Sequence, residues 1–273
     1  MADSILSSFL PLLIVTLGAF VSELAGVLNI AVEGIMILGS FVAAATAGSA
    51  LGPVPAVLCA GLAGLFLGLF LGFLHGRLSA NIFVAGLGMN VLASSLVTVL
   101  GQGLFHTQGI IRLPTGSSGM DLPLEIILGL GAFAFIFFSY SWSLMGIRFR
   151  SLANHADMLY ARGVNVRGYK IWALGISGAF AAIGGAFLTW NVGAFVPNGT
   201  NGKGWIALVL VYAGARHPLG IALACIAFVA SERLAISLQS SLVHPALIVG
   251  LPYLIVLLCL VGVQALARKR LDL

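Results

Sequence analysis

The chain has 273 residues, of which only 8% are charged, and its formal net charge is +5 at pH 7. Apolar residues make up 60% of the chain, and the mean hydropathy is +1.12. Because an ordinary soluble domain needs about 25% charged residues, this composition excludes a soluble enzyme, a nucleic-acid-binding domain and a disordered protein. The positive charge is better interpreted as a signal of membrane topology.

Long stretches without charge predict membrane-spanning helices. Residues 34–76 contain no Asp, Glu, Lys or Arg, and Pro53 and Pro55 provide a turn near the middle. We predict an all-α, polytopic helical membrane protein that forms one transmembrane domain over residues 1–273, with about nine (about eight to ten) spans. The predicted spans are 5–22, 28–50, 54–74, 81–102, 124–142, 170–191, 203–215, 217–239 and 245–267.

The first span, 5–22, is interpreted as a membrane helix and not as a signal peptide, because no basic residue precedes it. Ten of the 13 Lys and Arg residues fall into four segments: the 75–80 loop, the 143–170 loop, the turn at Arg216 and the tail after residue 267. If these segments share one side of the membrane, the positive-inside bias assigns that side to the cytoplasm. The N-terminus then lies on the outer side.

Glycine recurs every four residues along the third span. This spacing places Gly64, Gly68, Gly72 and Gly76 on one helix face, and Gly61 precedes them. Such a stripe allows a second backbone to approach closely in a membrane. We interpret it as a packing face; a moving or dimer-forming surface is the alternative.

Two segments are poor matches to a simple span. Residues 28–39 carry Asn29 and Glu33 within apolar sequence, and residues 204–215 are too short to cross a bilayer as a helix. Transporters often place short or interrupted segments at corresponding points of two internal repeats. The sequence therefore indicates a weak internal repeat.

Glu33 is the most informative acidic residue, because a carboxylate within a membrane span usually has a partner or faces a wet cavity. Three roles stay open. Near the cytoplasmic boundary Glu33 would cap a helix or pair with a base; beside the pathway it would have a structural or gating role; and within the pathway it would contact solute.

Amide and aromatic side chains provide further candidates for the substrate pathway. Asn90 lies in an otherwise apolar span and needs an interhelical partner or a place on the pathway wall. Asn191, Phe195 and Asn198 surround Gly193 and Pro197 at the outer end of the sixth span. Such a cluster can stack on and hydrogen-bond to a planar solute, although it also occurs in ordinary capped loops.

The 143–170 loop contains a short helical pattern. Asn154, a typical capping residue, precedes the pattern 156–162, and Gly163 provides a stop. The helix is interpreted either as a basic helix on the membrane surface or as a docking helix for a cytoplasmic motor subunit.

Neither metal binding nor catalysis is predicted for this chain. The three cysteines lie in apolar runs, and the five histidines show no metal-ligand spacing. The sequence contains no nucleophile elbow and no phosphate-binding loop.

Three stretches resemble one family, the permease subunits of bacterial ABC importers for branched-chain amino acids, simple sugars and nucleosides. Residues 22–34 (SELAGVLNIAVEG) resemble its (G/S)ExAGVxNIGxEG signature, with Ala31 in place of Gly, and especially its nucleoside-type branch. Residues 191–207 resemble the segment before the branch's late Gly-rich helix. Residues 150–166 resemble the region that contacts the ATPase, where the matching positions are Asn154, Ala156, Ala161, Gly163 and Val164.

The resemblance implies a permease subunit in the bacterial cytoplasmic (inner) membrane that imports a nucleoside or a related planar, ribose-bearing compound such as a flavin. It implies a cytoplasmic ABC ATPase as partner, which binds ATP and Mg²⁺, so that this chain carries no cofactor. It further implies a second permease subunit in a heterodimer, an extracytoplasmic solute-binding lipoprotein and surrounding membrane lipid, with no nucleic-acid partner.

Two other functions fit the same residues. One is a simple-sugar or branched-chain amino acid permease of the same family. The other is an ATP-independent secondary transporter, which would use Glu33 as its ion-coupling carboxylate. A purely structural membrane protein is disfavoured by the polar groups within the spans.

Overall fold

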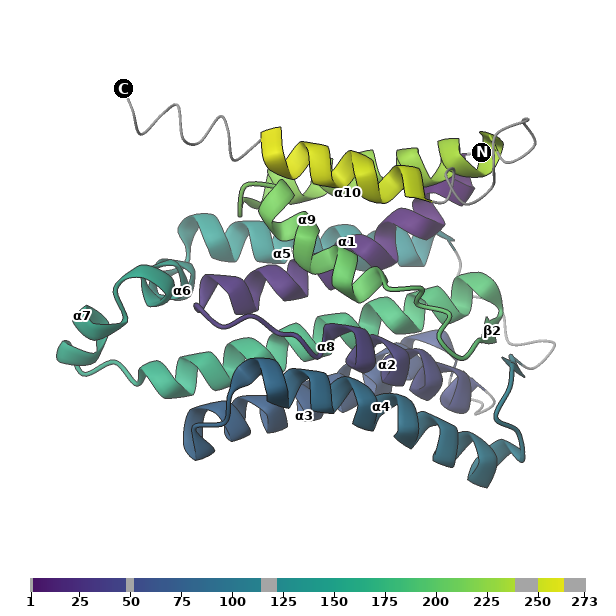
Figure 1. Cartoon of the computed structure of the whole chain (residues 1–273), viewed down its shortest axis with the longest axis horizontal. Coiled ribbons are helices and arrows are strands. Elements are labelled where there is room, and N and C mark those ends of the chain that lie inside the picture. The colour runs from purple at the N-terminus through teal and green to yellow at the C-terminus, as the bar shows by residue number, and fades with distance from the viewer. Residues whose placement is uncertain (1, 48–51, 114–121, 239–249, 263–273) are drawn as a thin grey trace.

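Helices make up most of the computed structural model, which describes residues 2–47, 52–113, 122–238 and 250–262 (Figure 1). A single pair of very short strands accompanies them in this part of the chain. In chain order the elements are α1 (Ala2–Leu24), α2 (Val32–Ala47), α3 (Pro53–Leu78), α4 (Ile82–Phe105), β1 (Ile111–Arg112), α5 (Leu122–Trp142), α6 (Leu144–Asn154), α7 (Ala156–Ala161), α8 (Val166–Val192), β2 (Ala194–Phe195), α9 (Lys203–Ala213), α10 (Pro218–Leu238) and a helix at Gly250–Gly262.

Six of the described helices are long and apolar enough to cross a membrane: α1, α3, α4, α5, α8 and α10. Three shorter apolar helices, α2, α9 and Gly250–Gly262, accompany them. Each predicted span overlaps one of these helices, so the prediction of an all-α, multi-pass membrane protein is confirmed. The number of crossings stays a prediction, because a crossing needs about 20 residues as a straight helix.

The helices α2 and α9 begin inside the bundle and not at its ends (Figure 1). With 16 and 11 residues, they are about 24 Å and about 17 Å long, against a hydrocarbon core of about 30 Å. They run from their starting points in opposite directions, α2 toward the end that holds β2 and α9 toward the end that holds α6 (Figure 1). The two segments that were poor matches to a simple span therefore contain helices shorter than the hydrocarbon core, and α9 is about half its thickness.

The predicted helix 28–50 is wrong at its start, because residues 25–31 form turns and irregular backbone and α2 begins only at Val32. The side chain of Asn29 accepts a hydrogen bond from the Ala31 backbone N–H at 3.1 Å, in the manner of an Asx turn. Such local bonding competes with helix formation, and it ends the helical pattern here. Residues 48–50 lie outside the described part of the chain.

The helix α8 occupies the centre of the bundle, where it packs against α1, α2 and α3. Its contact with α3 uses the predicted glycine stripe. A Cβ on Gly68 would lie 2.9 Å from the Gly175 Cα, and one on Gly72 would lie 2.8 Å from the Ile171 Cα. Both distances are too short for real Cβ contacts, so the stripe is confirmed as a packing face, and α8 is its partner.

Most of the described basic residues gather at one end of the bundle, which we call the basic end: Arg77, Arg148, Arg150, Arg162, Arg167, Lys170 and Arg216. The last turn of α3, the helices α6 and α7, the start of α8 and the end of α9 all lie at this end (Figure 1), and side-chain contacts link several of them. Arg148 donates a hydrogen bond to the Tyr169 hydroxyl at 2.6 Å, and the Tyr140 ring touches both Arg150 and His217. Arg268, Lys269 and Arg270 lie outside the described residues.

A short antiparallel pair joins two outer segments at the opposite end. Ile111 pairs with Phe195 and Arg112 pairs with Ala194, so the chain after α4 is tied to the chain after α8. Sequence analysis did not predict this pair, because two-residue strands leave no periodic pattern.

The 143–170 loop contains two helices where one was predicted. Ser143 caps α6, because its side chain accepts a hydrogen bond from the Met145 backbone N–H at 3.1 Å. The predicted cap is therefore wrong: Asn154 is the last residue of α6, and His155 precedes α7. The predicted stop at Gly163 agrees with the structure, in which this glycine has φ +76°.

The α3–α8 contact predicts the effect of one added methyl group. We expect Gly68→Ala to destabilise the detergent-solubilised protein by about 1–3 kcal/mol, because the two backbones must separate to admit the Cβ. Thermal unfolding measures this change. Gly131→Ala in α5 is the matched control, since no atom lies within 4 Å of its Cβ position. Equal melting temperatures for the two variants would contradict the packing argument.

Candidate functional site

The first turns of α2 and α9 meet at the side chain of Glu33. Its Oε1 accepts hydrogen bonds from the Thr200 hydroxyl at 2.5 Å and from the Gly202 backbone N–H at 3.1 Å. Its Oε2 accepts a hydrogen bond from the Gly204 backbone N–H at 2.7 Å. The first N–H groups of a helix have no partner within the helix and carry a partial positive charge. Glu33 therefore caps α9 from a position far away in the sequence.

The close approach of the two helices depends on a glycine. A Cβ on Gly204 would lie 2.7 Å from the Glu33 Cα, so any larger residue would push α9 away from α2. The position before α9, Gly202, provides no side-chain cap of its own. The carboxylate of Glu33 takes the place of that cap.

Two asparagines hold the non-helical backbone that leads into α2. The buried Asn29 side chain donates a hydrogen bond to the Ser177 hydroxyl of α8 at 2.9 Å. Asn90 of α4 accepts a hydrogen bond from the Gly34 N–H at 2.7 Å and donates one to the Ile30 carbonyl oxygen at 2.9 Å. Backbone polar groups within a membrane must find partners inside the protein. These side chains supply those partners.

The structure corrects the predicted position of Glu33. It lies at the start of α2 within the bundle (Figure 1), and not at the basic end, because residues 25–31 carry the chain back into the bundle before α2 begins. The capping role has a geometric basis here, with a helix N-terminus as the partner and not a basic residue. A direct contact between Glu33 and solute stays a prediction.

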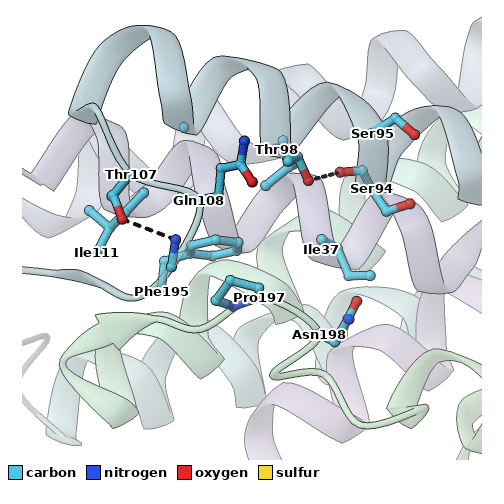
Figure 2. A pocket seen from close by; sticks show the side chains of 13 residues that line it. Ile37, Ser94, Ser95, Thr98, Thr107, Gln108, Ile111, Phe195, Pro197 and Asn198 are labelled. Carbon is cyan, nitrogen blue, oxygen red and sulfur yellow. Dashed lines mark hydrogen bonds between the residues drawn. The ribbon is translucent and has the colours of Figure 1, made fainter.

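A cavity of about 270 Å³ lies beside this junction, between α2, α4 and the chain after β2. Figure 2 shows Ser94, Ser95 and Thr98 of α4 facing Pro197 and Asn198 across it, with Ile37 of α2 between them. We call it the α2–α4 cavity; its lining residues are Ile37, Ser94, Ser95, Val97, Thr98, Gly101, Thr107, Gln108, Gly109, Ile111, Phe195, Pro197 and Asn198.

The polar groups of the α2–α4 cavity are hydroxyls and amides, and none of its described lining residues is charged. The Thr98 and Ser94 hydroxyls donate to backbone carbonyl oxygens of their own helix, at 3.0 Å each, which leaves their oxygen lone pairs available as acceptors. Phe195 is held in an edge-to-face contact with Phe41, at a centroid distance of 5.6 Å. The arrangement fits a neutral solute that offers hydrogen-bond donors and an apolar face.

The structure brings together two of the predicted pathway residues in this cavity, Phe195 and Asn198. Asn191 lies elsewhere: its side chain donates to the Ser7 carbonyl oxygen at 2.8 Å and to the buried Glu125 carboxylate at 2.9 Å. It therefore ties α8 to α1 and α5. Asn90 also lies outside the lining of the cavity, in the contact with the start of α2.

Sequence analysis missed the hydroxyl residues of α4. Ser94, Ser95 and Thr98 line the cavity although none of them was singled out. Their signal was available in the sequence, because residues at i and i+4 share a helix face and polar side chains stand out within an apolar span. Gln108 gave no such signal, since it lies in the loop after α4.

The predicted coupling positions surround α7 at the basic end. No described residue of α7 is buried, and Met158 and Tyr160 are strongly exposed. A groove of about 420 Å³ lies between α7 and the start of α8 and includes Ala156, Asp157 and Arg167 in its lining. Ala161 ends α7, and the Val164 N–H donates to the Leu159 carbonyl oxygen at 3.0 Å, which closes the turn at Gly163.

Comparison with known proteins adds a family assignment. Residues 1–261 match the family model described as the permease component of the branched-chain amino acid transport system. No solved structure matches the chain.

Three relatives are permease proteins by name. The chain is 31% identical over 224 residues to a putative glucose ABC transporter permease of Haloferax volcanii, with 73% of the chain and 66% of that protein covered. It is 26% identical to a nucleoside ABC transporter permease of Lactococcus lactis, over 80% of the chain and 76% of that protein. It is 28% identical to a guanosine ABC transporter permease of Bacillus subtilis, over 83% of the chain and 78% of that protein.

The contacts of Asn90 predict a local effect of its removal. Asn90→Ala leaves the Gly34 N–H and the Ile30 carbonyl oxygen without their partner, at a cost of about 1–3 kcal/mol for each buried group. We expect a lower melting temperature and faster amide hydrogen exchange in residues 25–34. The control is Gln102→Ala, which removes an exposed amide from the same helix. Unchanged exchange in residues 25–34 would show that Asn90 does not hold this segment.

Proposed function

Because the chain belongs to the family of permease components of the branched-chain amino acid transport system, we propose that it is the membrane-spanning subunit of an ABC importer for a nucleoside or a related planar, ribose-bearing compound such as a flavin. It is a multi-pass protein of the inner membrane. The relatives named as nucleoside and guanosine permeases support this choice of solute.

The observation that carries the choice of solute class is the uncharged lining of the α2–α4 cavity. An amino acid carries an ammonium and a carboxylate, and both need charged or strongly polar partners when they leave water. A nucleoside or a sugar needs hydroxyl and amide partners, which Thr98, Gln108 and Asn198 provide. The buried Phe195 ring in the lining favours a solute with a planar face. A simple sugar, as in the name of the glucose permease relative, is the second candidate.

A cytoplasmic ATPase is proposed to dock at the basic end and to bind the ATP and Mg²⁺. The seven basic residues gathered there assign this end to the cytoplasm by the positive-inside rule. The exposed helix α7 and the groove beside it offer a docking surface, with Asn154, Ala156, Ala161, Gly163 and Val164 as the coupling positions. ATP hydrolysis takes place on the partner and not on this chain.

A second, unlike permease subunit and an extracytoplasmic solute-binding lipoprotein complete the proposed importer. The lipoprotein would deliver solute at the end opposite the basic end, where the 194–198 chain lines the α2–α4 cavity. Membrane lipid covers the remaining apolar faces. An ATP-independent transporter is less well supported, because both oxygens of Glu33 accept hydrogen bonds from the protein and are committed to structure.

The test is purification in mild detergent with any bound partners, followed by reconstitution into vesicles and ATP-dependent uptake of labelled solutes. Thermal-shift screening of a co-purified binding protein against nucleosides, flavins and sugars identifies the solute. Co-purification of an ATPase, together with a nucleoside that stabilises the binding protein, supports the proposal. If a sugar stabilises the binding protein instead, the importer remains and its solute is a sugar. Uptake that persists without an ATPase and follows a proton gradient contradicts the ABC assignment.

A conservative change in the cavity tests the solute contact. Thr98→Val removes one hydroxyl and keeps the shape of the side chain, so we expect the solute concentration for half-maximal uptake to rise about two- to tenfold, as for one lost hydrogen bond. Thr98→Ser keeps the hydroxyl and should stay near the wild-type value. Equal values for Thr98→Val and the wild type would remove Thr98 from the solute site.

The coupling region is tested with two matched glycine variants. Gly163→Arg places a long, charged side chain at a left-handed position next to α7, and we expect it to abolish ATPase co-purification while membrane insertion continues. Gly52→Arg is the matched control. Gly52 precedes the first residue of α3, away from the basic end, and it also has a left-handed φ of +79° and no atom within 4 Å of its Cβ position. Normal ATPase binding by Gly163→Arg would contradict the proposed docking surface.

A further inference from the structure

One short segment separates two cavities. Phe195, Pro197 and Asn198 face the α2–α4 cavity. The alternate residues of the same segment, Ala194, Val196, Gly199 and Asn201, line a second cavity of about 210 Å³ against α2 and α8. The segment 194–201 is therefore a wall one chain thick. We call the second space the α8 cavity.

The wall has a left-handed residue at each end. Gly193 precedes it with φ 72° and Gly202 follows it with φ 77°, and no atom lies within 4 Å of the Cβ position of either glycine. Glycine adopts both signs of φ at little cost, so these two positions can absorb a change of backbone direction. Within the wall, Asn198 and Asn201 also have positive φ angles.

Contacts at both ends fix the wall in place, and the Phe195 ring also packs edge to face on Phe41 of α2. At its start, Ala194 and Phe195 pair with β1. At its far end, the buried Thr200 hydroxyl and the Gly202 N–H both donate to Glu33. Between these points, the Gly199 and Asn201 N–H groups donate to carbonyl oxygens of the wall itself, at Val196 and Asn198. Glu33 is thus the contact that ties the far end of the wall to α2.

We propose that the wall, together with Gly202 after it, forms a gate (residues 194–202) between the α2–α4 cavity and the α8 cavity, and that Glu33 is the positioning residue that holds the gate closed. The inference rests on the proposed function, since it assigns a moving part to the solute path of the same permease. Glu33 acts through Thr200 and the Gly202 and Gly204 N–H groups, and it needs no contact with solute.

The helix α9 links the gate to the basic end. It starts at Lys203, directly after the gate, and it ends at Ala213 next to Arg216 and His217. Arg216 contacts the Glu23 carboxylate at 3.2 Å, and the His217 ring touches Tyr140, which lies under Arg150 of α6. A displacement of α6 and α7 by the ATPase would therefore move a rigid helix of 11 residues whose N-terminus is held by Glu33.

The first experiment measures amide hydrogen exchange of the protein in lipid nanodiscs, without solute and without ATPase. The Gly202 and Gly204 amides report directly on the contact with Glu33. We expect exchange at these amides to become about tenfold faster in Glu33→Gln, because the new NH₂ group faces an N–H or O–H donor in place of a carboxylate oxygen. We expect the same increase in Thr200→Val, because the hydrogen bond from the Thr200 hydroxyl to the Glu33 carboxylate is lost. Unchanged exchange in both variants would overturn the proposal.

Matched controls separate the gate from general destabilisation. Thr200→Ser keeps the hydroxyl and should show wild-type exchange. Glu125→Gln alters another buried carboxyl of the bundle, which bonds to Asn191 and makes no contact with the gate. Its exchange at Gly202 and Gly204 should stay at the wild-type rate. Equal acceleration in Glu125→Gln and Glu33→Gln would show a general loss of stability and would overturn the specific role of Glu33.

The second experiment measures transport by the reconstituted importer as solute moved per ATP hydrolysed. A gate that no longer closes should lower this ratio at least about tenfold in Thr200→Val, while ATP hydrolysis continues. A merely structural role of Thr200 and Glu33 would lower the amount of folded protein and leave the ratio unchanged, and that result would overturn the proposal. If the wild type shows no ATP-dependent uptake, the proposed importer function is contradicted. The exchange measurement would then still decide whether Glu33 holds residues 194–202 in place.

Discussion

The start of α9 inside the helix bundle is the constraint on which the rest of the structure depends. Its first N–H groups have no partner within the helix, and a membrane interior supplies no water to replace one. The Glu33 carboxylate meets this need by accepting from the Thr200 hydroxyl and from the Gly202 and Gly204 N–H groups. Because Glu33 lies in the first turn of α2, the same contact fixes the two short helices α2 and α9 relative to each other.

The centre of the bundle is built to support these two broken segments. The glycine stripe of α3 brings the backbone of α8 very close, and the rigid pair that results holds Ser177 where Asn29 reaches it. Asn90 of α4 then supplies hydrogen-bond partners to the Ile30 carbonyl oxygen and the Gly34 N–H, before and after the start of α2. Two kinds of interaction therefore act together at the centre of the bundle. Dispersion between the closely packed backbones holds α3 against α8, and hydrogen bonds hold the non-helical segment that leads into α2.

The same arrangement connects the cavity to the basic end. The chain after β2 lines the α2–α4 cavity, passes Glu33 and continues directly into α9. That helix ends beside Arg216, at the end where α6 and α7 present their exposed surfaces. In the proposed importer, movement at the basic end is coupled to the α2–α4 cavity, and a short helix held at both ends by polar contacts is a direct physical route for that coupling.

Composition and local pattern alone determined the all-α membrane class, the positions of the apolar segments, the glycine packing face and the short segment 204–215, because each of these is set by residues close together in the chain. The end of α7 near Gly163 was also predictable from neighbouring residues, because a glycine is typical just past the end of a helix. Only the tertiary structure decided that Glu33 caps α9, that β1 pairs with β2, and that hydroxyls of α4 share a cavity with Phe195 and Asn198. The partners in each case lie far apart in the sequence, and helix packing selects them from many chemically similar side chains. The helix α6 left a signal that sequence analysis did not use: Ser143 is a typical capping residue, and Met145, Phe149 and Leu152 recur at helical spacing.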